Sequence, residues 1–311
     1  MCNQEKYNQI KNLCSDFYSE MDKLIAQVFF DFESINNEYL SDLRNYLFGE
    51  SKQIRSCLIF LLAKNLGYSS ADKDIVALAT VVEIIHNATL IHDDIIDDSP
   101  IRRGQDALHE KYSNKLGVIS GDFLLSLAMK LLLDLPPVVM QNFSRCLMQL
   151  CSGEIEQYFS LQKTPSFVIY FKKSEQKTSS LFIAGVISLF NLKKIECVSF
   201  IEAFANHFGR AFQIKDDLKN IISKDDNKPI LNDIEQGLYT LPVIYAYGEN
   251  KDLTNIPPEE ILEKTMAQAV IEKTINVLNE EVQSAINNIS VLLDNEYKKA
   301  IISLCNILKI G

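Results

Sequence analysis

The chain has 311 residues, of which 47% are hydrophobic and 23% are charged, a composition that favours a folded protein with a large core over a disordered one. Its net charge of −10 and isoelectric point near 5.0 argue against a nucleic-acid-binding protein, because such proteins usually carry a basic face. Its seven cysteines form no CxxC pair, so neither a zinc cluster nor a disulfide framework is indicated, and a reduced, cytoplasmic protein is predicted.

No transmembrane segment is expected. The N-terminus lacks the apolar core of a signal peptide. The apolar stretches LIFLLA (58–63) and IAGVISLF (183–190) are too short to cross a bilayer.

The placement of proline predicts long helices. No proline occurs before Pro100, between Pro165 and Pro229, or after Pro258, and each gap has room for several uninterrupted helices. Within 74–97, apolar residues recur at steps of three and four, which is the spacing of a helix. Turn-forming residues mark the expected breaks at 67–70, 99–100, 136–137, 164–165, 225–229 and 255–258. We therefore predict a single all-α domain over residues 1–311.

The helix predicted over 74–97 ends in four aspartates, followed by two arginines. Asp93 and Asp97 are four residues apart and share one helix face, with an axial separation of roughly 5.4 Å. Carboxylates bind Mg²⁺, and arginine binds phosphate oxygens, so this segment favours metal-bridged diphosphate chemistry. Acidic runs more often mark a solvated helix end, but the residues before Asp93 are mostly apolar or small, which favours a buried helix.

A second acidic pair lies in a similar setting. Asp216 and Asp217 end the apolar helical pattern of 208–220. Two such helices that face each other in a bundle would place carboxylates at the mouth of a shared cavity.

These segments, in their order along the chain, resemble the trans-isoprenyl diphosphate synthases, which are all-α prenyltransferases. The resemblance covers about Gly49 to Ala246 and depends most on DDxxD (93–97) followed by RRG (102–104). Further matches are KQIR (52–55), GD (121–122), GE with Gln157 (153–157), KT (177–178), Gln213 with DD (216–217), and DIEQGLYTLP (233–242). The resemblance implies an antiparallel helical bundle with a central active-site cavity, and an enzyme that condenses isopentenyl diphosphate with an allylic diphosphate.

The resemblance also implies roles for particular residues. Asp93, Asp97 and Asp216 would bind Mg²⁺, about three ions per site by family analogy. The allylic diphosphate would contact Arg102, Lys177 and Lys228. Isopentenyl diphosphate would contact Lys52, Arg55, His86 and Arg103. The oxygens of Thr178 and Gln213 would stabilise the allylic cation, although each of these two residues could equally be an ordinary hydrogen-bonding core residue.

The sequence departs from the family pattern at several positions. Asn220 and Leu238 replace an aspartate and a lysine that many members carry, and Ser51 and Ser56 replace a glycine and a proline. We expect weaker metal binding from the change at Asn220.

Product length is expected to depend on the residues one turn before the first acidic motif. Ala88 and Thr89 are small, which predicts an open channel and a medium-to-long product of about six to eight isoprene units by family analogy.

Two alternatives remain open. One is a weakly active large subunit that needs a small partner subunit, and the other is a terpene cyclase. A homodimer is the assembly that the resemblance implies.

Overall fold

The computed structural model describes residues 3–32, 37–48, 51–196, 198–222 and 232–310. Nearly all regular structure in these ranges is helical, which confirms the predicted fold class. The helices of the first half are α1 (Asn3–Asn12), α2 (Ser15–Phe30), α3 (Asn37–Phe48), α4 (Ile54–Asn65), α5 (Lys73–Ile96), α6 (Leu108–Lys111), α7 (Asn114–Leu133) and α8 (Pro137–Tyr158).

The second half of the chain is helical as well, and it includes one short π-helix. Its elements are α9 (Phe167–Ser174), the π-helix η1 (Glu175–Ser179), α10 (Ser180–Leu192), α11 (Val198–Ile222), α12 (Asn232–Glu235), α13 (Leu241–Tyr247), α14 (Pro258–Thr265), α15 (Gln268–Asn288) and α16 (Glu296–Ile307).

Most of the predicted breaks separate helices in the structure. Gly67 follows α4 with a φ of +86°, a left-handed conformation that glycine adopts without steric cost. Pro137 and Pro258 each occupy the first turn of a helix, where the missing N–H group is not needed. The predicted break at 225–229 lies outside the described residues.

A two-stranded antiparallel hairpin, which the sequence analysis did not predict, follows α5. Strand β1 (Ile101–Arg102) pairs with β2 (Gln105–Asp106) across a turn in which Arg103 and Gly104 have positive φ. Strands of two residues are too short to show alternation in a sequence. The hairpin is important because Arg102 lies in the strand and Arg103 in the turn, so the two side chains reach different surroundings.

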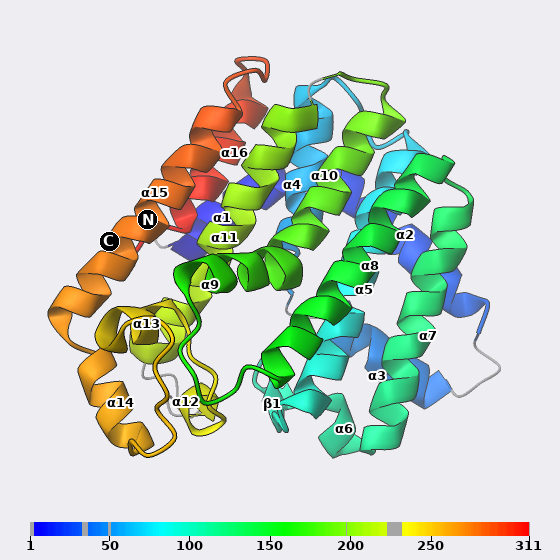
Figure 1. Ribbon diagram of the computed structural model, residues 1–311. Coiled ribbons are helices and arrows are strands. Elements are labelled where there is room, and N and C mark those ends of the chain that lie inside the picture. Colours follow the sequence, from blue (N-terminus) through cyan, green and yellow to red (C-terminus); the bar gives the residue numbers. More distant parts are fainter. Residues whose placement is uncertain (1–2, 33–36, 49–50, 197, 223–231, 311) are drawn as a thin grey trace.

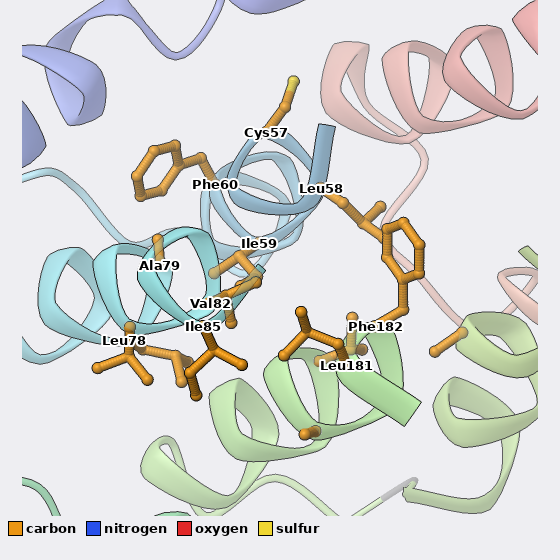
Figure 2. Packing of buried hydrophobic residues seen from close by; sticks show 14 of the residues in the cluster. Cys57, Leu58, Ile59, Phe60, Leu78, Ala79, Val82, Ile85, Leu181 and Phe182 are labelled. Atoms are coloured by element: carbon orange, nitrogen blue, oxygen red, sulfur yellow. The ribbon is translucent and has the colours of Figure 1, made fainter. Parts of the chain in front are cut away.

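The core lies between the long helices. Helix α10 packs against α4, α5, α8 and α11, and α7 packs along α5 (Figure 1). Figure 2 shows this packing, with Ile59 of α4, Val82 and Ile85 of α5, and Leu181 of α10 directed toward one another. A second, smaller cluster of buried apolar residues joins α12, α13 and α14.

Two helices, α5 and α7, are long and apolar enough to cross a membrane by length and composition alone. The two differ in their burial, because 72% of the apolar window of α5 but only 44% of that of α7 is buried within the protein. Neither helix is one of the short apolar stretches, 58–63 and 183–190, that stand out in the sequence. Helix α7 therefore presents an apolar face that the described residues do not cover.

Candidate active site

A cavity of about 560 Å³ lies among α5, α8, η1, α11 and the segment before α13. It brings together residues that are far apart in the sequence. The predicted site residues that line it are Arg55, His86, Thr89, Asp93, Asp97, Arg102, Lys177, Thr178, Gln213 and Asp216.

The C-terminal end of α5 forms one acidic wall of the cavity. Asp93 and Asp97 lie on it, and Glu154 of α8 lies nearby. Burial, followed by the charge of Glu154, raises the pKa of Asp93 to about 7; Asp97 acts in the same direction, against Lys177 and Arg102. Burial and the two neighbouring carboxylates disfavour the ionised form of Asp93, and a bound cation would favour it.

Asp94, the second aspartate of the motif, points away from this wall. Its side chain is 1% exposed and forms an ion pair with Arg102, whose Nε donates to Oδ1 at 2.9 Å. The hydroxyl of Tyr46 donates to Oδ2 at 2.6 Å. Burial, the largest single cause, would lower the pKa of Arg102, but the hydrogen bonds and the charge of Asp94, with smaller contributions from Tyr46 and Asp93, together outweigh burial and raise it. Asp94 therefore fixes a charged guanidinium at the edge of the cavity.

Arg103 is held by a different set of groups. Its Nη1 donates to the carbonyl oxygens of Tyr46 and Leu47 at 3.1 and 3.3 Å, and its Nη2 donates to Oδ1 of Asn87 at 3.4 Å. These carbonyls belong to the last turn of α3, where cations are favourable. The structure thus connects Arg103 with the end of α3 and with α5.

The π-helix η1 carries Lys177 and Thr178, which line the cavity. Such single-turn π-helices occur frequently at functional sites. The Nζ atom of Lys177 lies 2.6 Å from Oε1 of Glu154 and donates to Gln157 at 3.1 Å. Gly153 makes room for this approach, because a Cβ atom there would lie 2.8 Å from Cγ of Lys177. The GE motif by itself predicts no role for Glu154, which the structure places beside Lys177.

A chain of hydrogen bonds fixes the amide of Gln213. The hydroxyl of Thr178 donates to Oε1 of Gln213 at 2.6 Å, and Nε2 of Gln213 donates to Oδ1 of Asp217 at 2.8 Å. The hydroxyl of Tyr170 donates to Oδ2 of Asp217 at 2.6 Å. Thr178 and Gln213 are therefore held as a preorganised pair at the cavity wall.

Helix α11 supplies the second acidic wall through Asp216 and Asp217. Burial raises the pKa of Asp217 to about 7; the hydrogen bonds from Tyr170 and Gln213 oppose the shift, whereas Asp216 and Asp233 add to it. Asn220 stands one turn further on and donates to Oδ2 of Asp233 at 3.1 Å. An aspartate at this position would have no N–H group to donate and would face another carboxylate.

Arg55 and His86 form a basic corner of the same cavity. Arg55 is 9% exposed, its guanidinium lies over the ring of Phe182 at 4.7 Å, and its Nε has no hydrogen-bond partner among the described residues. Burial lowers the pKa of Arg55 to about 10. Burial, together with the charge of Arg55, also lowers the pKa of His86 well below its usual value, so its imidazole is neutral. A largely buried arginine that lines a cavity is suited to bind an anion.

Lys52 faces a second cavity of about 470 Å³, which Lys215 and Lys219 also line. Phe212 and Asp216 border both cavities, so the two adjoin. Burial, together with the charge of Lys219, lowers the pKa of Lys52. The structure thus separates Lys52 from the corner formed by Arg55 and His86.

The remaining predicted residues have different surroundings. Thr89 lines the main cavity beside Leu90, whereas Ala88 is fully buried in the core. Leu238 also lines the cavity. Lys228 lies outside the described residues.

The acidic residues do not form a complete metal site by themselves. Among the residues that the structure describes, no group of three or more His, Cys, Asp or Glu side chains could hold a metal ion. Carboxylates on two walls nevertheless suit Mg²⁺, which usually takes one or two protein carboxylates and completes its shell with water and substrate phosphates. The donor set therefore fits Mg²⁺ in company with a diphosphate.

Comparison with known proteins gives consistent results. A family model described as polyprenyl synthetase matches residues 37–278. The chain is 33% identical over 288 residues to a prenyl transferase of Cyanidium caldarium, covering 87% of this chain and 89% of that protein. It is 31% identical over 330 aligned positions to a decaprenyl-diphosphate synthase of Dictyostelium discoideum, covering 98% of this chain and 72% of that protein. In fold, it is similar to a polyprenyl synthase of Caulobacter crescentus solved with calcium and isoprenyl diphosphate, with a TM-score of 0.86 at 20% identity over 97% of both chains.

Proposed function

Because the chain belongs to the polyprenyl synthetase family, we propose that it is a prenyltransferase that joins isopentenyl diphosphate to an allylic diphosphate and releases diphosphate. The observation that carries this proposal is the arrangement of the main cavity. Two acidic walls, at Asp93 and Asp97 and at Asp216, face a cavity that Arg102 and Lys177 also line. The arrangement suits a diphosphate held by metal ions and by protein cations together.

Asp93, Asp97 and Asp216 would hold Mg²⁺, and about three ions per site are expected by family analogy. Bound Mg²⁺ would neutralise the diphosphate oxygens and so stabilise them as a leaving group. Arg102 is held in place by its ion pair with Asp94, and it would bind the allylic diphosphate together with Lys177. Lys228 remains proposed for the same role.

Thr178 and Gln213 would stabilise the allylic cation that forms when the bond from carbon to diphosphate oxygen breaks. The hydroxyl hydrogen of Thr178 is engaged by Gln213, which leaves the lone pairs of the Thr178 oxygen for the cation. The double bond of isopentenyl diphosphate then forms the new carbon–carbon bond. Loss of a proton restores a double bond, and released diphosphate accepts that proton.

The diphosphate of isopentenyl diphosphate would bind at the basic corner. The guanidinium of Arg55, which lines the cavity, would contact it, and the neutral imidazole of His86 can donate one further hydrogen bond. Lys52, from the adjoining cavity, and Arg103 are proposed to contact the same diphosphate. A terpene cyclase would have no need of a second diphosphate subsite, so the corner favours the prenyltransferase.

We propose a medium-to-long all-trans product of about six to eight isoprene units, by family analogy. Thr89 and Leu90 leave the cavity open above the first acidic wall. Further apolar lining comes from Leu150 and Ile155 of α8. A growing chain would therefore extend between α5 and α8.

The proposed assembly is a homodimer in the cytoplasm. Helix α7 exposes large apolar side chains, including Ile119 at 61%, Met129 at 52% and Leu133 at 76%. Exposed apolar patches of this kind mark interaction surfaces. A small partner subunit that covers the same face is the second candidate.

The proposal is tested by incubating the purified chain with Mg²⁺, isopentenyl diphosphate and either geranyl, farnesyl or geranylgeranyl diphosphate, and by chromatography of the labelled products. We expect elongation that depends on both substrates and stops when the metal is chelated. Asp93→Asn should lower turnover by about 10²-fold or more. The matched control is Asp98→Asn, because Asp98 is exposed in the same acidic run.

Turnover of an allylic diphosphate without isopentenyl diphosphate would instead identify a terpene cyclase. Activity that appears only after a second protein is added would favour the heteromeric synthase.

A further inference from the structure

The loop that carries Lys52 has a backbone conformation that its own residues do not favour. Gln53, just before α4, has φ +52° and ψ 45°, in the left-handed region. A residue with a Cβ atom persists there only where its surroundings fix it. Gln53 is only 8% exposed, so those surroundings are protein rather than solvent.

Side chains from the two N-terminal helices hold this loop. The hydroxyl of Tyr7 on α1 donates to the carbonyl oxygen of Lys52, and Tyr18 on α2 donates to the carbonyl oxygen of Gln53 at 3.2 Å. The ammonium group of Lys11 donates to Oε1 of Gln53 at 2.7 Å. Three donors from α1 and α2 thus converge on two consecutive residues.

The loop is held from the other side by α5. The backbone N–H of Ser56 donates to Oε1 of Glu83 at 2.9 Å, and both residues are at most 1% exposed. A proline at position 56 could not make this bond, because proline has no N–H group. Glu83 therefore fixes the start of α4. Helices α1 and α2 position the two residues before it, Lys52 and Gln53.

Helix α1 is itself well supported. It packs against α16 (Figure 1). The side chain of Tyr7 is only 4% exposed. Both α1 and α2 precede residue 37, where the match to the family model begins. The contacts to the loop therefore come from a part of the chain that the family model does not cover.

We propose that α1 and the first turn of α2 act as a clamp on the loop, and that Tyr7 and Lys11 are positioning residues for isopentenyl diphosphate, acting through the placement of Lys52. This inference rests on the proposed function, in which Lys52 binds that substrate. Neither Tyr7 nor Lys11 is required to hold the allylic diphosphate, because the acidic walls and η1 are held by other contacts.

The test is steady-state kinetics of Tyr7→Phe, which removes one hydroxyl and keeps the buried ring. We expect the KM for isopentenyl diphosphate to rise about three- to tenfold, which corresponds to the loss of one hydrogen bond, while the KM for the allylic diphosphate stays unchanged and the melting temperature falls by no more than a few degrees. Lys11→Met should act in the same direction, so the result does not depend on one variant. Tyr247→Phe is the matched control, because its hydroxyl also donates to a backbone carbonyl, that of Glu260, far from the loop in sequence.

A double-mutant cycle separates positioning from general destabilisation. In a Lys52→Met background, Tyr7→Phe should change the KM for isopentenyl diphosphate by less than about twofold, because the residue it positions is gone. An unchanged KM in Tyr7→Phe and Lys11→Met, or an equal rise for both substrates, would overturn the clamp while the proposed function stands. If the unaltered enzyme shows no turnover with isopentenyl diphosphate in the same assay, both the proposed function and the clamp are wrong.

Discussion

The four aspartates at the end of α5 differ in what they contact. Asp93 and Asp97 line the cavity, whereas Asp94 is buried against Arg102 and Tyr46. Asp98 is exposed and has a φ of +46°. Neighbouring positions on a helix point in different directions, so one acidic run supplies both the candidate metal ligands and the residue that holds an arginine.

The positions of Ala88 and Thr89 change the expected effect of substitutions on product length. Thr89→Phe would place a ring in the cavity and should shorten the main product by one or more isoprene units. Ala88→Phe would force the ring into a packed core and should cost about 1–3 kcal/mol of stability. Chromatography of products and thermal unfolding of both variants check this. Equal shortening by both variants, at unchanged stability, would contradict it.

The raised pKa of Asp217 predicts a pH-dependent stability in the absence of metal. Because the folded-state pKa is raised to about 7, protonated Asp217 contributes stability that is complete near pH 4 and is lost as the pH rises through about 7. Asp217→Asn keeps a neutral group of the same shape at every pH. Between about pH 5 and pH 8, the melting temperature of the Asp217→Asn variant should therefore fall by a few degrees less than that of the unaltered chain.

Calorimetry in the presence of a chelator measures this difference, with Asp98→Asn as the exposed control. Identical pH profiles for Asp217→Asn and the unaltered chain would show that Asp217 does not titrate in this range.

Among the elements, η1 depends most on its neighbours. Its residues, EQKTS, do not distinguish a π-helix from an α-helix in the sequence. The structure shows it between α8 and α11, with Gly153 and Gly209 on the two sides. A Cβ atom at Gly209 would lie 2.6 Å from Cα of Ser179, so the two backbones pack directly together.

Gly209→Ala should therefore displace η1 together with Lys177 and Thr178. We expect kcat to fall about 10–100-fold, because displacements near 1 Å can cost that much. Gly185→Ala is the matched control, since its Cβ would meet only side-chain atoms of Ile59 and Val82, at 3.0 Å. A Gly209→Ala enzyme with normal kcat would mean that η1 tolerates the shift.

At the scale of the whole molecule, α7 exposes an apolar face, which the proposed dimer would cover. Ile119→Asp should convert the proposed dimer into a monomer, because a charge would be buried at the centre of an apolar contact. Sedimentation equilibrium measures the change. Val168→Asp is the control, since Val168 is 78% exposed on α9. An unaltered chain that is already monomeric would contradict the homodimer.

The sequence by itself determined the helical fold and the main residues of the cavity. Helical periodicity and the placement of proline depend on local backbone preferences, and the motifs name residue types that diphosphate chemistry needs. The family match confirms the family that these motifs indicated. The roles of the individual residues and the single-domain organisation stay predictions.

Only the tertiary structure decided which groups each of these residues contacts. The pairing of Asp94 with Arg102, the contact of Glu154 with Lys177 and the hold of Tyr7 on Lys52 join segments that the sequence leaves separate. The exposure of α7 was decided in the same way. Local propensity cannot specify such contacts, because they depend on which helix faces meet when the whole chain packs.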